Sequence, residues 1–390
     1  MLRVGITGQK GFVGTHLFNT LGLQREAFER VAFERSYFEN QETLDTFVLK
    51  CDVIVHLAAL NRHNEPEVIY ETNLNLVKLL VASLERTKSK AHVLISSSSQ
   101  EERDNLYGKS KKEGRALLAN WATKAEANFT GLIIPNVFGP FGHPYYNSVV
   151  ATFSHQVANG EIPKIEIDGQ LKLIYVGELV AEIIKAIRSK NNDPKYTVNH
   201  TIEAKVSELL ALLQEYKTTY QDQGQIPAIA STFELNLFNT FRCYMDIANH
   251  FPVKFTQHTD PRGTFVEVIR LGVGGQVSFS TTVPGVTRGN HYHTRKIERF
   301  AVIKGKALIQ LRKIGTAEVL DFYLDGNEPS YVDMPIWYTH NIKNIGDEVL
   351  YTNFWINEFF DPNDPDTYFE NVKLNTDSAD LADLPRIFIR

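Results

Sequence analysis

Four residues in the last third of the chain have side chains that commonly bind transition metals. His291 and His293 are separated by one residue, and Glu298 and His340 follow them. Alternate residues of a strand share a face, so on a strand both histidines project to the same side. Three imidazoles and one carboxylate suit Zn²⁺ or another divalent transition metal, with room left for water or substrate. A lone His-x-His is often a surface coincidence, but four ligand-type residues predict a metal site. The mixture of nitrogen and oxygen ligands favours a catalytic metal over a structural one.

A second group of residues near the start of the chain has the pattern of a nucleotide-binding loop. Gly8, Gly11 and Gly14 follow a predicted strand at 2–7 and open a predicted helix. In this context glycines let the backbone approach a pyrophosphate at the N-terminus of a helix. A glycine-rich turn without a ligand is the alternative, but the order of strand, loop and helix favours a dinucleotide site.

Tyr107 and Lys111 form a third candidate group. They are four residues apart at the start of a predicted helix, and this spacing places them on one face, one turn apart. A phenol has a reference pKa of about 10 and becomes a useful acid or base near neutrality only where a nearby cation favours the phenolate. Lys111 and an oxidised nicotinamide ring could both supply that charge, so the pair indicates proton transfer.

The elements that must position these groups change in type along the chain. Up to about residue 135, short apolar runs alternate with longer amphipathic ones, which predicts a doubly wound α/β domain with a parallel sheet. After residue 252, many short strand-like runs with turn signals predict a β-sandwich or small barrel. We expect two domains, 1–245 and 253–390, with the linker at about 220–252.

The composition narrows the classes of partner. The chain has 390 residues, 43% of them hydrophobic, and a formal net charge of −5, which gives no electrostatic case for nucleic acid or an anionic membrane. The longest apolar runs are shorter than the roughly 20 residues that span a bilayer. Only Cys51 and Cys243 are present and they have no pairing pattern, so we expect a cytoplasmic protein that acts on a small molecule.

The first part of the chain resembles the extended short-chain dehydrogenases/reductases over residues 1–185. The resemblance rests on the following motifs: Thr7-Gly8-x-x-Gly11-x-x-Gly14, His56-Leu57-Ala58-Ala59, Asn73, the serines of ISSSSQ, and Tyr107-x-x-x-Lys111. It implies that Tyr107 donates a proton to the sugar oxygen, that Lys111 lowers the pKa of Tyr107 and holds the ribose, and that a serine orients the carbonyl. Ser98 is the chosen serine and Ser97 the close alternative. The cofactor contacts it implies are Gly8, Lys10, Gly11, Phe12, Val13, Gly14, Leu57, Ala58, Ala59 and Lys111.

The choice between NAD and NADP depends on the end of the second predicted strand. Glu34 could bind the ribose hydroxyls of NAD, whereas Arg35 together with Lys10 could hold the extra phosphate of NADP. Two cations against one acid favour NADPH. The alternative is that Arg35 is a solvated surface residue.

The last part of the chain resembles the cupin family. Gly285, His291, His293, Glu298 and Gly305 fit its first motif, and Pro335, His340 and Asn344 fit its second, with Trp337 in place of the usual glycine. This resemblance implies a jelly-roll barrel that holds a metal, most simply zinc, through His291, His293, Glu298 and His340. Tyr338, Tyr292 and Lys296 lie nearby in the sequence as possible bases, and each also fits a role in packing or at the surface.

A reductase followed by a metal cupin resembles the bifunctional enzymes of capsular polysaccharide and O-antigen synthesis, and segments such as YGKSK, DPRGTFVE and GNHYHTRKIERF carry this likeness. It implies C3 epimerisation of a UDP-linked 4-keto-6-deoxy-N-acetyl amino sugar by the cupin. The first domain would then reduce the C4 ketone with NADPH, on the route to UDP-N-acetyl-L-fucosamine. A homodimer is expected. The alternative is a sugar-nucleotide reductase or epimerase whose cupin only dimerises.

Overall fold

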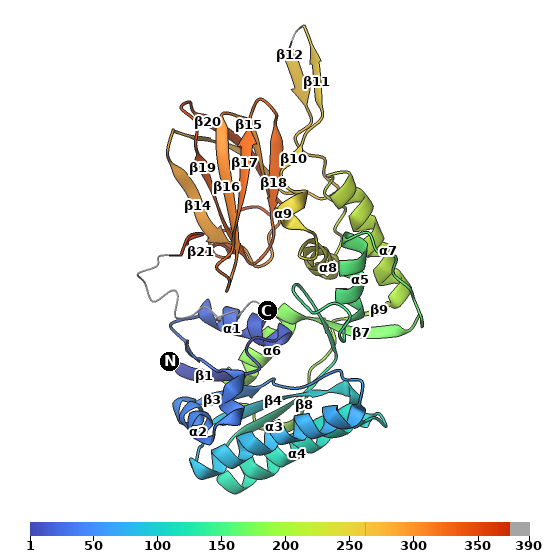
Figure 1. Ribbon diagram of the computed structural model, residues 1–390, viewed down its shortest axis with the longest axis vertical. Coiled ribbons are helices and arrows are strands. Elements are labelled where there is room, and N and C mark those ends of the chain that lie inside the picture. Colours follow the sequence, from blue (N-terminus) through green and yellow to red (C-terminus); the bar gives the residue numbers. More distant parts are fainter. Residues whose placement is uncertain (262, 375–390) are drawn as a thin grey trace. The chain divides into compact units, whose positions relative to one another are not determined.

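The computed structural model describes residues 1–261 and 263–374 (Figure 1). The chain divides into two compact units. The N-terminal unit comprises Met1–Thr152 and Ile165–Val206, and the C-terminal unit comprises Phe153–Lys164 and the described residues from Ser207 onward. Among the described residues, no helix is both long and apolar enough to cross a membrane.

A six-stranded parallel sheet forms the centre of the N-terminal unit, with the order β2-β1-β3-β4-β5-β8. Its strands are β1 (Leu2–Thr7), β2 (Phe28–Val31), β3 (Val53–His56), β4 (His92–Ser98), β5 (Phe129–Ile134) and β8 (Asp193–Thr197). The helices around it are α1 (Phe12–Gly22), α2 (Gln41–Lys50), α3 (Pro66–Arg86), α4 (Leu106–Ala125) and α6 (Val176–Arg188). The doubly wound, Rossmann-like sheet predicted from the sequence is therefore confirmed.

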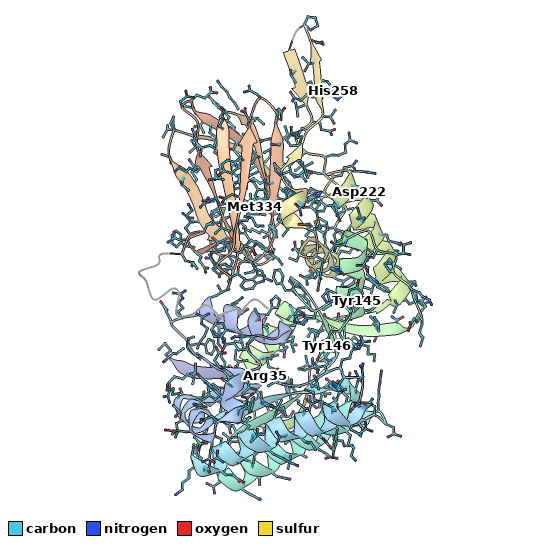
Figure 2. All side chains as sticks on the ribbon, in the orientation of Figure 1. Arg35, Tyr145, Tyr146, Asp222, His258 and Met334 are labelled. Atoms are coloured by element: carbon cyan, nitrogen blue, oxygen red, sulfur yellow. The ribbon has the colours of Figure 1, made fainter. Side chains whose placement is uncertain are left out.

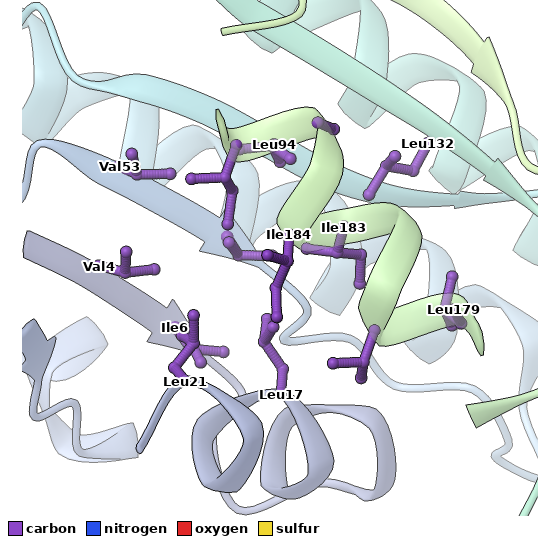
Figure 3. Close-up of a cluster of buried hydrophobic side chains, with 14 of the residues drawn as sticks. Val4, Ile6, Leu17, Leu21, Val53, Leu94, Leu132, Leu179, Ile183 and Ile184 are labelled. Carbon is purple, nitrogen blue, oxygen red and sulfur yellow. The ribbon is translucent and has the colours of Figure 1, made fainter. Parts of the chain in front are cut away.

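Two apolar clusters cover the two faces of this sheet. One contains side chains of α1 and α6, and the other contains side chains of α2, α3 and α4. Figure 3 shows the first cluster, in which Leu17 and Leu21 of α1 and Ile183 and Ile184 of α6 meet the side chains of the central strands. Burying each such side chain contributes roughly 1.5–3 kcal/mol. Because strand β3 is buried along its whole length, it reads as a continuous apolar run in the sequence.

Short elements complete the N-terminal unit. A small sheet is formed by β6 (Asn136–Phe138), β7 (Gln170–Tyr175) and β9 (Ile202–Lys205). The 3-10 helix η1 (Arg35–Glu39) follows β2, and η2 (Ser99–Glu102) follows β4 directly. Helix η2 therefore occupies the short interval between Ser98 and the helix that carries Tyr107.

The C-terminal unit combines helices with two five-stranded antiparallel sheets, whose orders are β10-β18-β15-β20-β13 and β17-β16-β19-β14-β21. The first sheet contains β10 (Val253–Lys254), β18 (Ser330–Met334), β15 (Glu298–Lys304), β20 (Leu350–Ile356) and β13 (Gln276–Thr282). The second contains β17 (Val319–Asp325), β16 (Lys306–Lys313), β19 (Tyr338–Asn344), β14 (Thr287–Tyr292) and β21 (Tyr368–Phe369). A hairpin of β11 (Gln257–Asp260) and β12 (Gly263–Val266) stands apart from both sheets. The predicted all-β architecture is confirmed.

The helices of the C-terminal unit are α5 (Val149–Ala158), which begins in the other unit, α7 (Val206–Tyr216), the π-helical η3 (Lys217–Asp222), α8 (Thr232–Arg242) and α9 (Ile247–His250). A buried polar network joins them to the first sheet. Arg299 of β15 binds Asp333 of β18 through two hydrogen bonds of 2.7 and 2.9 Å. Tyr220 donates to the same carboxylate at 2.7 Å, and Arg242 donates to the Tyr220 hydroxyl at 3.1 Å.

This network explains why residues 207–250 belong to the same compact unit as the strands that follow them. Tyr220 lies in the stretch whose composition predicts a linker, yet it is 3% exposed. The polar composition of 220–231 thus reflects buried hydrogen bonding as well as exposed turns. The domain bounds inferred from the sequence, 1–245 and 253–390, stay a prediction. The two compact units of the structure divide earlier in the chain, after Val206.

Candidate active and metal sites

A cavity of about 990 Å³ lies at the carboxyl end of the parallel sheet. Such a position at the ends of parallel strands is where open α/β sheets bind ligands. The predicted cofactor residues that line it are Gly8, Gly11, Phe12, Val13, Gly14, Leu57, Ala58, Ala59 and Lys111. The predicted catalytic residues Tyr107 and Ser98 line it as well, together with Ser97. The structure therefore brings three segments that are far apart in the sequence to one cavity.

The glycine loop has no room for side chains. Gly8 has a φ of +79°, a conformation that residues other than glycine adopt with strain. A Cβ atom on Gly14 would lie 2.2 Å from the Gly8 carbonyl oxygen, so the first turn of α1 sits directly against the loop. Gly11 precedes this helix without a side-chain cap, which leaves the first N–H groups of the helix available to an anion. These features fit a dinucleotide pyrophosphate.

The two cations predicted to select NADP lie outside the lining of this cavity. Lys10 donates to Glu34 at 2.9 Å, and both side chains are about half exposed. Arg35 is exposed at the start of η1 (Figure 2). The acid and the base that sequence analysis weighed against each other thus form an ion pair, and a 2′-phosphate would have to compete with Glu34 for Lys10.

Tyr107, Lys111 and Ser98 meet at the inner wall of the cavity. Asn105 caps helix α4 by accepting from Gly108 N at 2.7 Å, which starts the helix with Tyr107 in its first turn. The Lys111 ammonium lies 5.8 Å from the centre of the Tyr107 ring and donates to Ser96 O at 3.1 Å. The Ser98 side chain is near enough to Tyr107 to favour its phenolate, and its Oγ accepts from Gln100 N at 3.1 Å.

Burial controls the protonation of this pair. It raises the pKa of Tyr107 to about 12, against the opposing effect of the nearby Ser98 side chain. It lowers the pKa of Lys111 to about 8, although the charge of Glu101 acts in the other direction. The phenol is therefore protonated at neutral pH and suited to donate a proton, while Lys111 still carries most of its charge.

The neighbouring hydroxyl, Ser97, is used differently. It donates to the carboxylate of Glu101, which is 5% exposed and also receives two hydrogen bonds of 2.8 Å from Arg115. Arg115 lies one turn after Lys111 on α4, and it also donates to Pro194 O at 2.7 Å. Sequence analysis did not select Arg115, and its four-residue spacing from Lys111 is the signal that could have found it.

Further polar residues line the cavity that sequence analysis did not select. They are Asn61, Gln100, Asn136, His143, Tyr146 and Asn147. The Tyr146 hydroxyl accepts a hydrogen bond of 2.9 Å from Asn61 N, and Arg62 donates to the backbone carbonyls of Tyr145 and Tyr146 (Figure 2 labels both tyrosines). Two loops of the N-terminal unit are thereby joined by hydrogen bonds beside the cavity that contains Tyr107. Their amide and hydroxyl groups are the type that recognises a sugar.

The four predicted metal ligands come together in the C-terminal unit. One ligand atom from each of His291, His293, Glu298 and His340 lies within 4.8 Å of the others. They come from β14 and the residue following it, from β15 and from β19. Strand β14 contains a bulge, because Gly289 pairs with Asn341 whereas His291 pairs with His340. The His291 and His340 rings are 4.5 Å apart between centres.

The geometry around the cluster fixes its ring nitrogens. His293 Nδ1 lies 2.6 Å from Asp366 O, and His340 Nδ1 lies 3.1 Å from Tyr338 O, so both rings carry the proton on Nδ1 and direct Nε2 toward Glu298. The two Nε2 atoms lie 3.2 and 3.1 Å from Glu298 Oε2. His340 Nε2 is buried and makes no well-aligned hydrogen bond within the described residues. A buried nitrogen directed at a carboxylate and two further imidazoles fits a divalent transition metal.

The charges in this cluster also favour a cation. Burial alone would raise the pKa of Glu298, but the adjacent His293 and His340 side chains outweigh it and lower the pKa. Burial and the neighbouring His340 lower the pKa of His291 to about 4. An ionised carboxylate beside a neutral imidazole is the state that metal coordination requires.

The three residues considered as bases in the barrel have other contacts. Lys296 donates to Pro365 O at 2.7 Å. Tyr292 is buried and its ring contacts Trp337 and Tyr368. Burial raises the pKa of Tyr338, which disfavours the phenolate. Trp337 has a φ of 61°, so the position where cupins have glycine keeps the left-handed backbone despite a bulky side chain.

Known proteins resemble the chain over both units. Residues 4–200 match the NAD dependent epimerase/dehydratase family, and residues 258–368 match the polysaccharide biosynthesis C-terminal domain. A UDP-2-acetamido-2,6-beta-L-arabino-hexul-4-ose reductase of Pseudomonas aeruginosa is 33% identical over 94% of this chain and 98% of its own length.

Solved structures also resemble the chain over nearly its whole length. The capsular polysaccharide assembling protein CapF of Staphylococcus aureus is 36% identical, with a TM-score of 0.60 over 95% of this chain and all of its own. CapF with the inhibitor 3-isopropenyl-tropolone is 34% identical, with a TM-score of 0.55 and the same coverage. The predicted resemblance to enzymes of capsular polysaccharide synthesis is confirmed.

Proposed function

The chain belongs to the NAD-dependent epimerase/dehydratase family, and from this premise we propose that it is a bifunctional enzyme of capsule or O-antigen synthesis. Its substrate is a UDP-linked 4-keto-6-deoxy-N-acetyl amino sugar, and the product lies on the route to UDP-N-acetyl-L-fucosamine. The C-terminal unit, a metal cupin, epimerises C3, and the N-terminal unit reduces the C4 ketone with NADPH. One observation carries the proposal: a buried cluster of three histidines and Glu298 occurs in the same chain as a Tyr107–Lys111 reductase site.

In the reductive step the chain supplies a proton and holds the substrate. The nicotinamide, when bound, delivers hydride to C4. The Tyr107 hydroxyl, oriented by Ser98, donates its proton to the ketone oxygen, so that the carbonyl becomes an alcohol. The positive charge of Lys111 next to the ring stabilises the phenolate that remains.

In the epimerising step the chain acts on a C–H bond that the ketone has already made acidic. A divalent ion held by His291, His293, Glu298 and His340 would offset the negative charge that develops on the ketone oxygen. Removal of the C3 proton and its return on the opposite face inverts the carbon. Reduction of C4 then makes the inversion permanent, because the ketone that allowed it is gone.

Two names among the relatives support this scheme. The Pseudomonas relative is named as a reductase of a 4-ketohexose with a UDP group and an acetamido substituent, which is the second half of the proposed reaction. CapF binds a tropolone inhibitor, and tropolones chelate divalent metals through two adjacent oxygens. NADPH is proposed as the reductant because Lys10 and Arg35 both flank the end of β2, and zinc as the metal because of its preference for nitrogen and carboxylate ligands.

A homodimer is proposed on the exposed apolar edge of the first sheet of the C-terminal unit. Val277 and Phe279 of the edge strand β13 are 54% and 73% exposed. An uncovered apolar edge strand is a place where a second copy can pair. This surface also favours the second candidate function, a reductase whose cupin serves only to dimerise.

The experiment that separates these functions uses purified protein, NADPH and a UDP-4-keto amino sugar in heavy water. We expect stoichiometric oxidation of NADPH and deuterium at C3 of the product, measured by absorbance and NMR. His291→Ala should abolish the deuterium exchange, and Tyr107→Phe should abolish NADPH oxidation while exchange continues. Exchange that survives in His291→Ala would support the dimerising cupin, and a wild-type protein that does neither would refute both proposals.

A further inference from the structure

Residues 358–369, called the strap below, run beside two of the metal-cluster residues. The end of the strap is strand β21, which pairs with β14 so that Phe369 lies opposite His291 and Tyr368 lies opposite Tyr292. The residues before β21 contact the loop 294–296, which connects His293 to Glu298. The strap therefore touches the cluster both at β14 and at this loop, although it follows them by about 70 residues in the sequence.

The Asp366 side chain organises the loop 294–296. Its Oδ1 accepts from Thr294 N at 3.0 Å and from Thr294 Oγ1 at 2.6 Å. Its Oδ2 accepts from Arg295 N at 3.0 Å and from Lys296 N at 3.1 Å. Asp366 is 2% exposed and has a φ of 39°, so it occupies a strained backbone position inside the protein. A buried carboxylate that satisfies three consecutive N–H groups fixes the backbone of the loop strongly.

The backbone of the same residue reaches the cluster directly. The Asp366 carbonyl oxygen lies 2.6 Å from His293 Nδ1, on the side of the ring opposite the nitrogen that faces Glu298. A contact of the neighbouring residue holds this carbonyl in place, because Lys296 donates to Pro365 O at 2.7 Å.

We propose that Asp366 is a positioning residue for metal binding, whose carboxylate closes the loop 294–296 and whose carbonyl orients the His293 ring. This inference rests on the proposed metal site. Groups that orient a metal-binding histidine typically change metal affinity by 10–100-fold when they are removed. The strap is thus part of the metal site, although none of its residues is a ligand.

The test replaces Asp366 by asparagine in the full chain and measures Zn²⁺ affinity by competition with a chromophoric chelator. Asparagine has the same shape, but both carboxylate oxygens accept from donors, so either orientation of the amide places an NH₂ group against an N–H or O–H donor. We expect Asp366→Asn to bind Zn²⁺ at least about tenfold more weakly than the wild type. The matched control is Asp364→Asn, which also removes one acid from the strap, but an exposed one whose carboxylate pairs with Arg295. Its affinity should change by less than about fivefold.

A second readout separates positioning from mere support of the fold. The visible spectrum of the Co²⁺-substituted protein reports the geometry of the ligands, and it should change in Asp366→Asn and stay as in the wild type in Asp364→Asn. If Asp366→Asn does not fold, judged by circular dichroism, Thr294→Val removes one hydroxyl bond to the same carboxylate and should still weaken Zn²⁺ binding several-fold.

Three results would overturn the inference. The first is an Asp366→Asn variant that folds and binds Zn²⁺ as tightly as the wild type. The second, if that variant does not fold, is unchanged affinity in Thr294→Val. The third is a wild-type protein that binds no divalent metal, which would also refute the proposed epimerase, whereas the first two leave that proposal intact.

Discussion

Replacing Ser98 or Ser97 by alanine distinguishes which hydroxyl takes part in ketone reduction. The two serines are adjacent at the end of β4, and both line the cavity. The Ser98 hydroxyl lies beside Tyr107 and favours its phenolate, whereas the Ser97 hydroxyl donates to Glu101. Ser98→Ala therefore removes a neighbour of Tyr107, the proposed proton donor, and Ser97→Ala removes a hydrogen bond to a buried carboxylate.

The two variants are expected to lose different properties: Ser98→Ala loses catalytic rate, and Ser97→Ala loses folding stability. Loss of one hydrogen bond that aligns the reacting groups costs about 3 kcal/mol of transition-state stabilisation, so kcat in Ser98→Ala should fall by about 10²-fold or more. Glu101 keeps both hydrogen bonds from Arg115 when Ser97 is removed. We expect Ser97→Ala to lose about 1–3 kcal/mol of stability, with kcat within about threefold of the wild type.

The assay is the initial rate of NADPH oxidation at saturating ketone, combined with thermal unfolding of each variant. The KM for NADPH should stay unchanged in Ser98→Ala, because the side chain acts on the ketone and on Tyr107. If Ser97→Ala lost kcat and Ser98→Ala only lost stability, the assignment of the two hydroxyls would be wrong.

Two further predictions concern charge. Burial lowers the pKa of Lys111 to about 8, so kcat/KM for reduction should fall as pH rises through about 8. Glu101→Gln should move this fall to lower pH, because the charge of Glu101 raises the pKa of Lys111. A pH–rate profile that is flat in the wild type or unshifted in the variant would contradict this reasoning. Burial raises the pKa of Asp333, but Arg299 outweighs it, so the pKa is lowered and the pair stabilises the fold at neutral pH and less on acidification. Asp333→Asn should cost about 3–5 kcal/mol in denaturant unfolding, against less than about 1 kcal/mol for the exposed Glu267→Gln, and equal losses would refute the distinction.

The sequence predicts the parts of the sites that depend on local spacing. The glycine loop, the Tyr107–Lys111 pair and the His291–His293 pair each lie within one turn or one strand, where the helical and strand periods fix which residues share a face. The structure places all of these where the spacing requires. The parallel sheet and the later antiparallel sheets follow from patterns of the same local kind.

The features that spacing could not predict depend on long-range contacts. Whether Ser97 or Ser98 faces Tyr107 depends on where β4 ends, and counting along the strand leaves an error of one residue, which reverses the face. Asp366 contacts a loop about 70 residues earlier, and no local pattern links the two. Tyr220 looks like part of a polar linker because its partner, Asp333, lies 113 residues further on.

The bulge in β14 determines whether the four predicted metal ligands can lie together. If the strand kept a regular register without the bulge, Asn290 would lie opposite His340, and His291 and His293 would turn to the other face of the sheet. Every ligand would still be encoded, and the sheet could still form. Whether the predicted ligands meet therefore depends on how the residues after Gly289 pair with β19, and a search for histidines alone cannot show this.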